Sequence, residues 1–205
     1  MCEVIPANSE NAIERAAKAV AEGLLVAFPT DTVYGLGASL QRPKAVLRIY
    51  SAKSRPPDKP IPVLIPDVES LSLIAAEMPS AVSKLSRAFW PGPLTIVLKS
   101  SPAVPKEVTA GGETVAVRMP NHEIALKLLR KAGAMAVTSA NISGFPPPLT
   151  AEEVVAQLCD KIEIVLDGGK CPGGIPSTIV DLTGEPPIIL REGPIPPSEV
   201  LRLAR

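Results

Sequence analysis

The chain has 205 residues, of which 46% are hydrophobic and 20% are charged. This balance excludes an intrinsically disordered chain, which is poor in apolar residues and rich in net charge. The 21 basic residues equal the 21 acidic residues, so the net charge gives no support to a nonspecific binder of nucleic acid or of membrane surfaces.

Hydrophobic periodicity predicts helices that alternate with short strands along most of the chain. Ser9 is the expected N-cap of the first helix, and Gly23 is expected to end it. A glycine-rich turn at 35–37 is predicted before the second helix, which begins at Pro43. Thr150 is the expected cap of the last predicted helix. The predicted helices span 9–22, 43–52, 67–76, 79–88, 122–132 and 150–159, and the predicted strands span 24–28, 62–65, 94–99, 114–118, 134–138, 162–166, 177–182 and 187–191.

Alternating helices and strands favour an α/β fold with a layered sheet. Several strands after residue 94 follow one another without a helix, so the sheet is expected to be mixed and not purely parallel. No stretch resembles a linker between two cores, and we therefore expect a single domain over residues 1–205. No apolar run reaches the roughly 20 residues that a membrane span needs, and the N-terminal residues do not resemble a signal peptide.

The cysteines and the histidine restrict the chemistry. Cys2, Cys159 and Cys171 form no C-x-x-C pair and are odd in number. They predict reduced thiols in a cytoplasmic protein, and neither a disulfide framework nor a zinc site. His122 is the only histidine, which excludes a multi-histidine metal site.

Polar side chains follow several predicted strands at the point where each strand ends. They are Thr32, Arg118, Ser139, Asn141 and Arg191. Ligands of open α/β sheets bind beyond the carboxyl ends of strands, and arginine forks suit a carboxylate or a phosphate. The alternative for Thr32, Ser139 and Asn141 is that they form side-chain turns at the strand ends.

Positive charge is concentrated between residues 42 and 59, which hold six basic side chains and one acidic side chain. Arg42, Lys44 and Arg48 lie at or just before the predicted helix 43–52, and a solvated helix face explains them. Lys53, Arg55 and Lys59 lie in a proline-bounded loop and are candidates for contact with an anionic ligand. The common glycine-rich phosphate-binding motif, G-x-x-x-x-G-K-[ST], is absent from the sequence.

Two residues near the first strand each have two open interpretations. Tyr34 either stacks on a base or packs under the loop that follows the strand. Asp31 either accepts hydrogen bonds within a turn or lies near a magnesium ion. The sequence itself does not separate these alternatives.

Seven ordered blocks of sequence carry a family resemblance. They are PTDTVYGLGA at 29–38, KSRPPDKP at 53–60, WPGPLTIVL at 90–98, TVAVRMPNH at 114–122, VTSANISG at 137–144, PSTIVDL at 176–182 and LREGPI at 190–195. With these blocks the chain resembles the YrdC family of threonylcarbamoyl-AMP synthases over nearly its whole length. It looks like the short form of that family, without the additional C-terminal domain of longer members.

The resemblance implies an open, twisted mixed sheet flanked by helices, with a positively charged cavity. It implies an enzyme that joins L-threonine, bicarbonate or CO2, and ATP into L-threonylcarbamoyladenylate and pyrophosphate. Magnesium would accompany the ATP. A separate transferase would then pass the threonylcarbamoyl group to the tRNA adenosine next to the anticodon, and direct contact of this chain with tRNA is a further expectation.

The resemblance also implies roles for individual residues. Threonine would be held by Thr32, Arg118, Ser139 and Ser177. ATP would be contacted by Lys53, Arg55, Lys59, Thr114, Asn141 and Arg191, with Lys53 and Arg55 as the catalytic cations. Two positions depart from the pattern of some members, because Leu64 replaces a histidine and Leu149 replaces a threonine or serine.

Two other functions are compatible with the fold class. The first is a non-catalytic module that binds tRNA or double-stranded RNA in the basic concavity. Only six aromatic residues are present, which argues against a broad stacking surface for RNA. The second is a carbamoyl-handling domain like the related module of hydrogenase maturation proteins, which normally comes with further domains.

Overall fold

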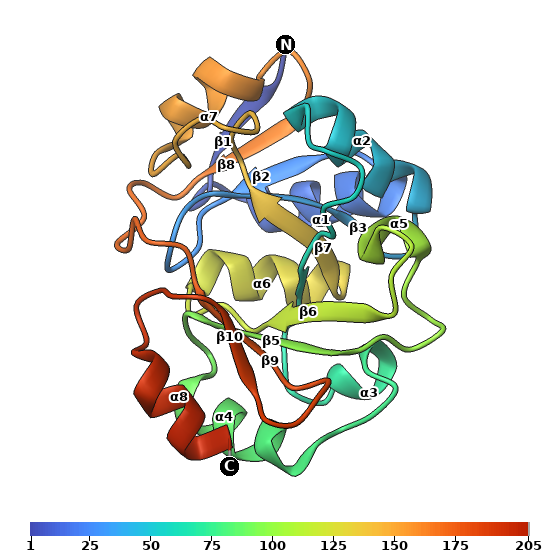
Figure 1. The fold of residues 1–205 in the computed structure, drawn as a ribbon. Helices are drawn as coiled ribbons and strands as arrows, with labels where there is room; N and C mark the ends of the chain where they lie inside the picture. Colours follow the sequence, from blue (N-terminus) through green and yellow to red (C-terminus); the bar gives the residue numbers. More distant parts are fainter. Residues whose placement is uncertain (205) are drawn as a thin grey trace.

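The structure is a computed structural model that describes residues 1–204 (Figure 1). Its strands are β1 (Glu3–Pro6), β2 (Val26–Phe28), β3 (Gly35–Ser39), β4 (Val63–Leu64), β5 (Leu94–Lys99), β6 (Thr114–Arg118), β7 (Met135–Ser139), β8 (Ile164–Asp167), β9 (Thr178–Asp181) and β10 (Ile188–Arg191). Its helices are α1 (Ala12–Glu22), α2 (Pro43–Lys53), α3 (Leu71–Ile74), α4 (Ser80–Phe89), α5 (Lys106–Thr109), α6 (Glu123–Ala132), α7 (Ala151–Leu158) and α8 (Pro197–Ala204).

All the described strands join in one sheet with the order β1-β8-β2-β3-β7-β4-β6-β5-β9-β10. Four neighbouring pairs are parallel, namely β1–β8, β2–β8, β4–β6 and β5–β9, and the other five are antiparallel. The expected α/β fold with an open mixed sheet is therefore confirmed. Figure 1 places α7 and the N-terminus at one end of the molecule, and α4, α8 and the C-terminus at the other.

Two apolar clusters cover the two faces of the sheet. Successive side chains of a strand point to opposite faces, so Val26 and Phe28 of β2 belong to one cluster and Ala27 to the other. The smaller cluster packs α1 against α6 and includes Leu64 and Val137. The larger cluster includes the buried faces of α2, α4, α7 and α8. Both faces of the sheet are thus buried for much of its width.

Two local predictions near the N-terminus are wrong. Ser9 does not cap α1, because its hydroxyl donates to the Pro6 carbonyl at 2.7 Å and the helix begins later, at Ala12. Residues 35–37 form strand β3 and not a turn. A Cβ atom on Gly37 would lie 2.6 Å from Met135 Cε and 3.0 Å from Phe28 Cε1. The glycine therefore serves close packing across the sheet, and not a reversal of the chain.

Short elements account for most of the differences between prediction and structure. β1, β3, α5 and α8 were not expected, and the helix predicted at 67–76 shrinks to α3. β1, α3 and α5 have four residues each, which is too few to show a period. The sequence-based prediction overlooked α8, which has eight residues. None of the helices within residues 1–204 combines the length and the apolar character needed to cross a membrane.

The expected cap of α7 is confirmed. Thr150 Oγ1 accepts a hydrogen bond from the Glu153 backbone N–H at 3.4 Å, and the Glu153 carboxylate accepts one from Leu149 N at 2.6 Å. We predict that Thr150→Ala lowers the free energy of unfolding by about 1 kcal/mol, because one N–H of the first turn loses its partner. Chemical denaturation measures this change. Thr150→Ser keeps the oxygen and should retain the wild-type value, and equal losses in both variants would contradict the cap.

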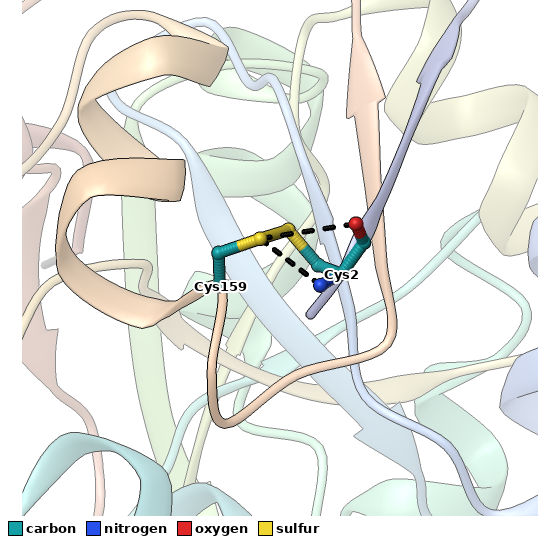
Figure 2. The surroundings of a disulfide bond; sticks show 2 residues. All are labelled: Cys2 and Cys159. Atoms are coloured by element: carbon teal, nitrogen blue, oxygen red, sulfur yellow. Dashed lines mark hydrogen bonds between the residues drawn. A yellow bond between two sulfur atoms is a disulfide. The ribbon is translucent and has the colours of Figure 1, made fainter.

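A disulfide joins Cys2 to Cys159, and the prediction of reduced thiols is wrong for this pair (Figure 2). The two Cα atoms are 4.8 Å apart although 157 residues separate them in the sequence. β1 pairs in parallel with β8, and α7 ends shortly before β8, so the sheet brings Cys2 beside the end of α7. Sequence spacing carries no information on this proximity. Cys171 is a free, buried thiol, and burial raises its pKa to about 11.

Candidate active site

A cavity of about 470 Å³ lies across seven consecutive strands of the sheet, from β3 to β10. On β5 the wall takes alternate residues, Thr95 and Val97, while Ile96 between them faces the larger apolar cluster. Leu64 and Val137 both line the cavity and belong to the smaller cluster. The cavity therefore lies beside the core formed by α1 and α6.

The cavity brings together seven of the ten predicted site residues. They are Thr32, Arg55, Arg118, Ser139, Asn141, Ser177 and Arg191. Three guanidiniums thus share one wall, and no Asp or Glu side chain lines it. Lys53, Lys59 and Thr114 lie outside the wall.

Arg118 is the most constrained cation of the site. It is 6% exposed, its Nε donates to the Gly92 carbonyl at 2.9 Å, and its Nη1 donates to Thr32 Oγ1 at 3.0 Å. Its Nη2 donates to Asp31 Oδ1 at 2.5 Å. A guanidinium has five N–H groups, so two remain, one on each terminal nitrogen. That is the number that bidentate binding of a carboxylate requires.

The direction of the hydrogen bonds decides what Thr32 can offer a ligand. Thr30 Oγ1 donates to the Val33 carbonyl at 2.7 Å, so its 3.0 Å bond with Thr32 Oγ1 must be donated by Thr32. Thr32 Oγ1 already accepts from Arg118, which leaves one lone pair on this residue of the cavity wall. A group that binds Thr32 here must therefore be a hydrogen-bond donor, such as an amine.

A close backbone approach holds this loop in place. A Cβ atom on Gly173 would lie 2.6 Å from the Asp31 carbonyl oxygen and 2.8 Å from Thr32 Cα. The next residue, Gly174, donates its N–H to the Thr32 carbonyl at 2.7 Å. Only a residue without a side chain permits this packing, which fixes the position of Thr32.

The β9–β10 hairpin supplies the second arginine. Arg191 Nε donates to the Ser177 carbonyl at 2.9 Å, and its Nη2 donates to Ser177 Oγ at 3.1 Å. Ser177 Oγ also shares a 2.7 Å hydrogen bond with Thr95 Oγ1 from β5. Burial lowers the pKa of Arg191, and the positive charge of Arg118 lowers it further. The two guanidiniums are therefore close enough to repel each other.

The proline-bounded loop after α2 supplies the third arginine. Arg55 Nε donates to the Lys59 carbonyl at 3.1 Å, and its Nη2 donates to the Pro60 carbonyl at 2.8 Å. These bonds hold the guanidinium at the cavity wall. The Lys59 side chain itself is exposed and does not line the wall, and the carbonyl of this residue holds Arg55. Thr114 lies on the same side of β6 as Ala116 and Arg118, but beyond the wall.

Lys53 does not line the cavity and is 1% exposed. Its Nζ donates to the carbonyl oxygens of Ser139 and Asn141. It therefore braces the end of β7 and the residues just after it, which carry two residues of the wall. The expected direct contact between Lys53 and a phosphate does not follow from this geometry, because the ammonium group is enclosed by backbone oxygens.

The burial of Lys53 gives a prediction for pH dependence. Burial lowers its pKa from 10.5 to about 7, and the positive charge of Arg55 adds to the effect. Between these two values the unfolded chain holds a proton that the folded protein has released, so stability should rise with pH. We predict that, as pH rises above about 7, the unfolding free energy of the wild type increases relative to that of Lys53→Met, which has no titrating group at this position. Denaturant titrations below and above that pH measure it, and a pH-independent difference would contradict it.

Asn141 presents an acceptor that has no partner in the described part of the chain. Its Nδ2 donates to the carbonyls of Ile142 and Phe145, both at 2.8 Å, which fixes the orientation of the amide. Its Oδ1 is buried and accepts no hydrogen bond from the described residues. Buried polar atoms are normally satisfied, so Oδ1 is suited to a donor group of a ligand.

Two residues of the site have roles that the sequence did not settle. Tyr34 is buried, and it packs against the segment after β8, since its hydroxyl donates to the Gly169 carbonyl at 2.8 Å and accepts from Gly168 N at 3.2 Å. Asp31 pairs with Arg118 and accepts from Asn121 N at 3.1 Å. The sequence alone offered no sign of this ion pair, because its partners are 87 residues apart.

A second recess, of about 560 Å³, lies between the turn before α1 and the last turns of α6. It contains none of the predicted site residues. Two of its basic side chains are already paired, Lys127 with Glu123 and Lys131 with Glu14. Nothing in this recess resembles the built arrangement of hydrogen bonds around Arg118.

The protein offers no metal-binding cluster of its own within residues 1–204. No group of three or more His, Cys, Asp or Glu side chains there could hold a metal ion. The cavity wall likewise lacks a carboxylate. The residues present therefore do not fit a resident magnesium ion.

Comparison with known proteins places the chain in a family. The model of the Sua5, YciO and YrdC family, described as telomere recombination, matches residues 18–193. Curated relatives named threonylcarbamoyl-AMP synthase come from Pyrococcus abyssi and Bacillus subtilis, with 49% and 43% identity over 92% of this chain. The chain spans only 56% and 55% of the length of these two relatives.

The fold agrees with a solved structure of that family. The crystal structure of P. abyssi Sua5 complexed with L-threonine superposes with a TM-score of 0.94 and 46% identity. The match covers 99% of this chain and 60% of the other. The family model covers well over half of the chain, and the relatives share its sequence across nearly its whole length. The chain therefore belongs to the Sua5, YciO and YrdC family.

Proposed function

We propose that the protein is a nucleotidyltransferase that makes L-threonylcarbamoyladenylate and pyrophosphate from L-threonine, bicarbonate or CO2, and ATP. One observation carries this proposal, namely the arrangement around Arg118. Its two free N–H groups lie beside an acceptor oxygen on Thr32, which suits the carboxylate and the amine of one α-amino acid. The names of the family relatives and the threonine bound to P. abyssi Sua5 agree with it.

The proposed reaction has two steps. The threonine amine attacks CO2 and loses a proton, which forms a carbamate. A carbamate oxygen then attacks the α-phosphorus of ATP, so an O–P bond forms while the bond between the α-phosphorus and the bridging oxygen breaks. Pyrophosphate leaves with that oxygen and its electron pair. Two anions must approach each other in the second step, so cations have to reduce their repulsion.

Different residues of the wall would bind the amino acid and the nucleotide. Arg118 and Thr32 would fix the amino acid, with Ser139 and Ser177 completing the wall around it. Arg55 and Arg191 would face the triphosphate and stabilise the charge on the leaving pyrophosphate. Asn141 Oδ1 would accept a hydrogen bond from a hydroxyl or amino group of the nucleotide. Positioning and electrostatics suffice for such a reaction, so no covalent protein intermediate is needed.

Magnesium enters this proposal only as part of the substrate. Phosphate oxygens supply ligands that magnesium prefers, and the ion would arrive with ATP. The product is a reactive mixed anhydride, so a separate transferase that consumes it for tRNA modification is part of the proposal. A cytoplasmic location, where ATP, threonine and tRNA are all present, belongs to it as well.

The proposal is tested by incubating the protein with ATP, threonine, bicarbonate and magnesium. We expect pyrophosphate release that depends on threonine and on bicarbonate, and mass spectrometry should detect threonylcarbamoyl-AMP. Omission of threonine is the matched control, because an ordinary ATPase would continue without it. Nucleotide cleavage that is independent of threonine, or no cleavage at all, would remove the proposal.

A further inference from the structure

The three arginines of the cavity differ in how their charge is balanced. Asp31 lies 2.5 Å from Arg118, and both side chains are almost fully enclosed, with exposures of 11% and 8%. Arg55 and Arg191 donate only to neutral carbonyl and hydroxyl oxygens. Within the described residues, no carboxylate lies within salt-bridge distance of either of them, and Asp58 acts on Arg55 only from farther away.

Asp31 is itself held in place from two sides. Its Oδ1 accepts from Arg118 Nη2 and from the backbone N–H of Asn121, just beyond the end of β6. The close packing of Gly173 fixes the backbone of the same residue. The carboxylate therefore keeps its position whether or not a ligand is present.

The difference in balance has a chemical consequence. The pair of Arg118 and Asp31 is neutral overall, so it binds a ligand through its two remaining N–H groups and not through excess charge. A carboxylate with a single charge matches such a site. A polyphosphate gains far more from uncompensated cations, because Coulomb energies in an enclosed site grow with the charge of the ligand.

We propose that Asp31 is a specificity-determining and positioning residue, which reserves Arg118 for the carboxylate of an amino acid and leaves polyphosphate to Arg55 and Arg191. The inference rests on the proposed function, since it names how the two anionic substrates are kept apart. Without the carboxylate of Asp31, Arg118 becomes a third uncompensated cation beside Arg191. Pyrophosphate or the triphosphate of ATP then competes for the position of the amino acid.

Asp31→Asn isolates the charge, because the amide oxygen can still accept from Arg118 and from Asn121. Calorimetry measures the affinity for L-threonine with and without inorganic pyrophosphate, so no turnover is required. We expect pyrophosphate to weaken threonine binding to the variant about tenfold or more and to leave binding to the wild type unchanged. Asp160→Asn, an exposed site with the same change in charge, should behave as the wild type.

The double variant Asp31→Asn with Arg118→Gln assigns any new pyrophosphate site. Pyrophosphate bound at Arg118 must disappear in the double variant. An Asp31→Asn protein whose threonine affinity falls equally with and without pyrophosphate has only lost structure, and that result overturns the inference. Threonine affinity that matches the wild type under both conditions overturns it as well.

Two further outcomes are informative. The Asp31→Asn variant could fail to fold in a chloride buffer. The inference then requires that pyrophosphate at equal ionic strength restores the folded protein, because pyrophosphate would compensate the charge of Arg118. Failure of this rescue overturns the inference. If the wild type itself binds no threonine, the proposed function fails. A different result overturns only the inference about Asp31. In that case the wild type binds threonine, but threonine binding to the Asp31→Asn variant is not weakened by pyrophosphate.

Discussion

Arg118→Gln is expected to lower kcat/KM for threonine about 100-fold or more, because under the proposed function the variant would lose two charge-assisted hydrogen bonds to the threonine carboxylate. Glutamine keeps an amide group in the wall but offers neither the fork nor the positive charge. Steady-state kinetics with threonine as the varied substrate measure the loss. Arg130→Gln on the exposed side of α6 is a matched control and should leave the kinetics unchanged.

Stability must be separated from binding in this experiment. Removing Arg118 leaves the Asp31 carboxylate enclosed without its cation, which is expected to cost about 3–5 kcal/mol of folding free energy. The added change Asp31→Asn removes that buried charge, so the double variant should regain most of its stability. It should not regain threonine turnover. A double variant that recovers both would show that Arg118 acts only on the fold.

Reduction of the disulfide is expected to lower the melting temperature by about 10 °C or more. The bond between Cys2 and Cys159 closes a loop of 157 residues, and chain entropy assigns about 5 kcal/mol to a cross-link of that span. A protein of this size changes its melting temperature by about 2–4 °C per kcal/mol. Calorimetry with and without a thiol reductant measures the shift.

The matched controls replace the cysteines one at a time. Cys2→Ser and Cys159→Ser should each melt at the temperature of the reduced wild type, and reductant should not change either variant further. Cys171→Ser tests whether reductant acts elsewhere, because Cys171 is the free thiol. Equal melting temperatures for oxidised and reduced wild type would show that this cross-link does not constrain the unfolded chain.

Sequence periodicity predicted the long helices well because each buries a repeating apolar face. α2 and α6 begin and end within one residue of their predicted limits. The strands β5 and β6 match as well, since β-branched residues dominate them. β3 was missed because its two glycines are typical of a turn. Side chains on neighbouring strands explain their presence in a sheet, namely Val137 beside Gly35, and Met135 and Phe28 beside Gly37.

The sequence predicted which site residues stand at strand ends, but it did not predict the hydrogen-bond partners of the site residues. Arg118 and Arg191 end strands that the sequence located, and because β6 and β10 run in the same direction these two ends lie at one edge of the sheet. Ser139 ends β7, which runs in the opposite direction, so its place in the wall did not follow from strand ends alone. The burial of Lys53 could not be predicted from the sequence, because a lysine at the end of a helix in a basic stretch ordinarily faces solvent. Its partners are backbone oxygens of residues more than 80 positions away, and a sequence pattern contains no record of them.

Because the cavity spans much of the sheet, the binding of small molecules in it is expected to restrict the relative motion of the strands. Seven adjacent strands contribute to its wall, so every change in the twist between neighbouring strands alters the distance from Thr32 to Arg191. An amino acid and a nucleotide bound as proposed would connect distant strands across this width. Their joint presence should slow amide hydrogen exchange in β4, β5 and β6, including at backbone groups that touch neither molecule.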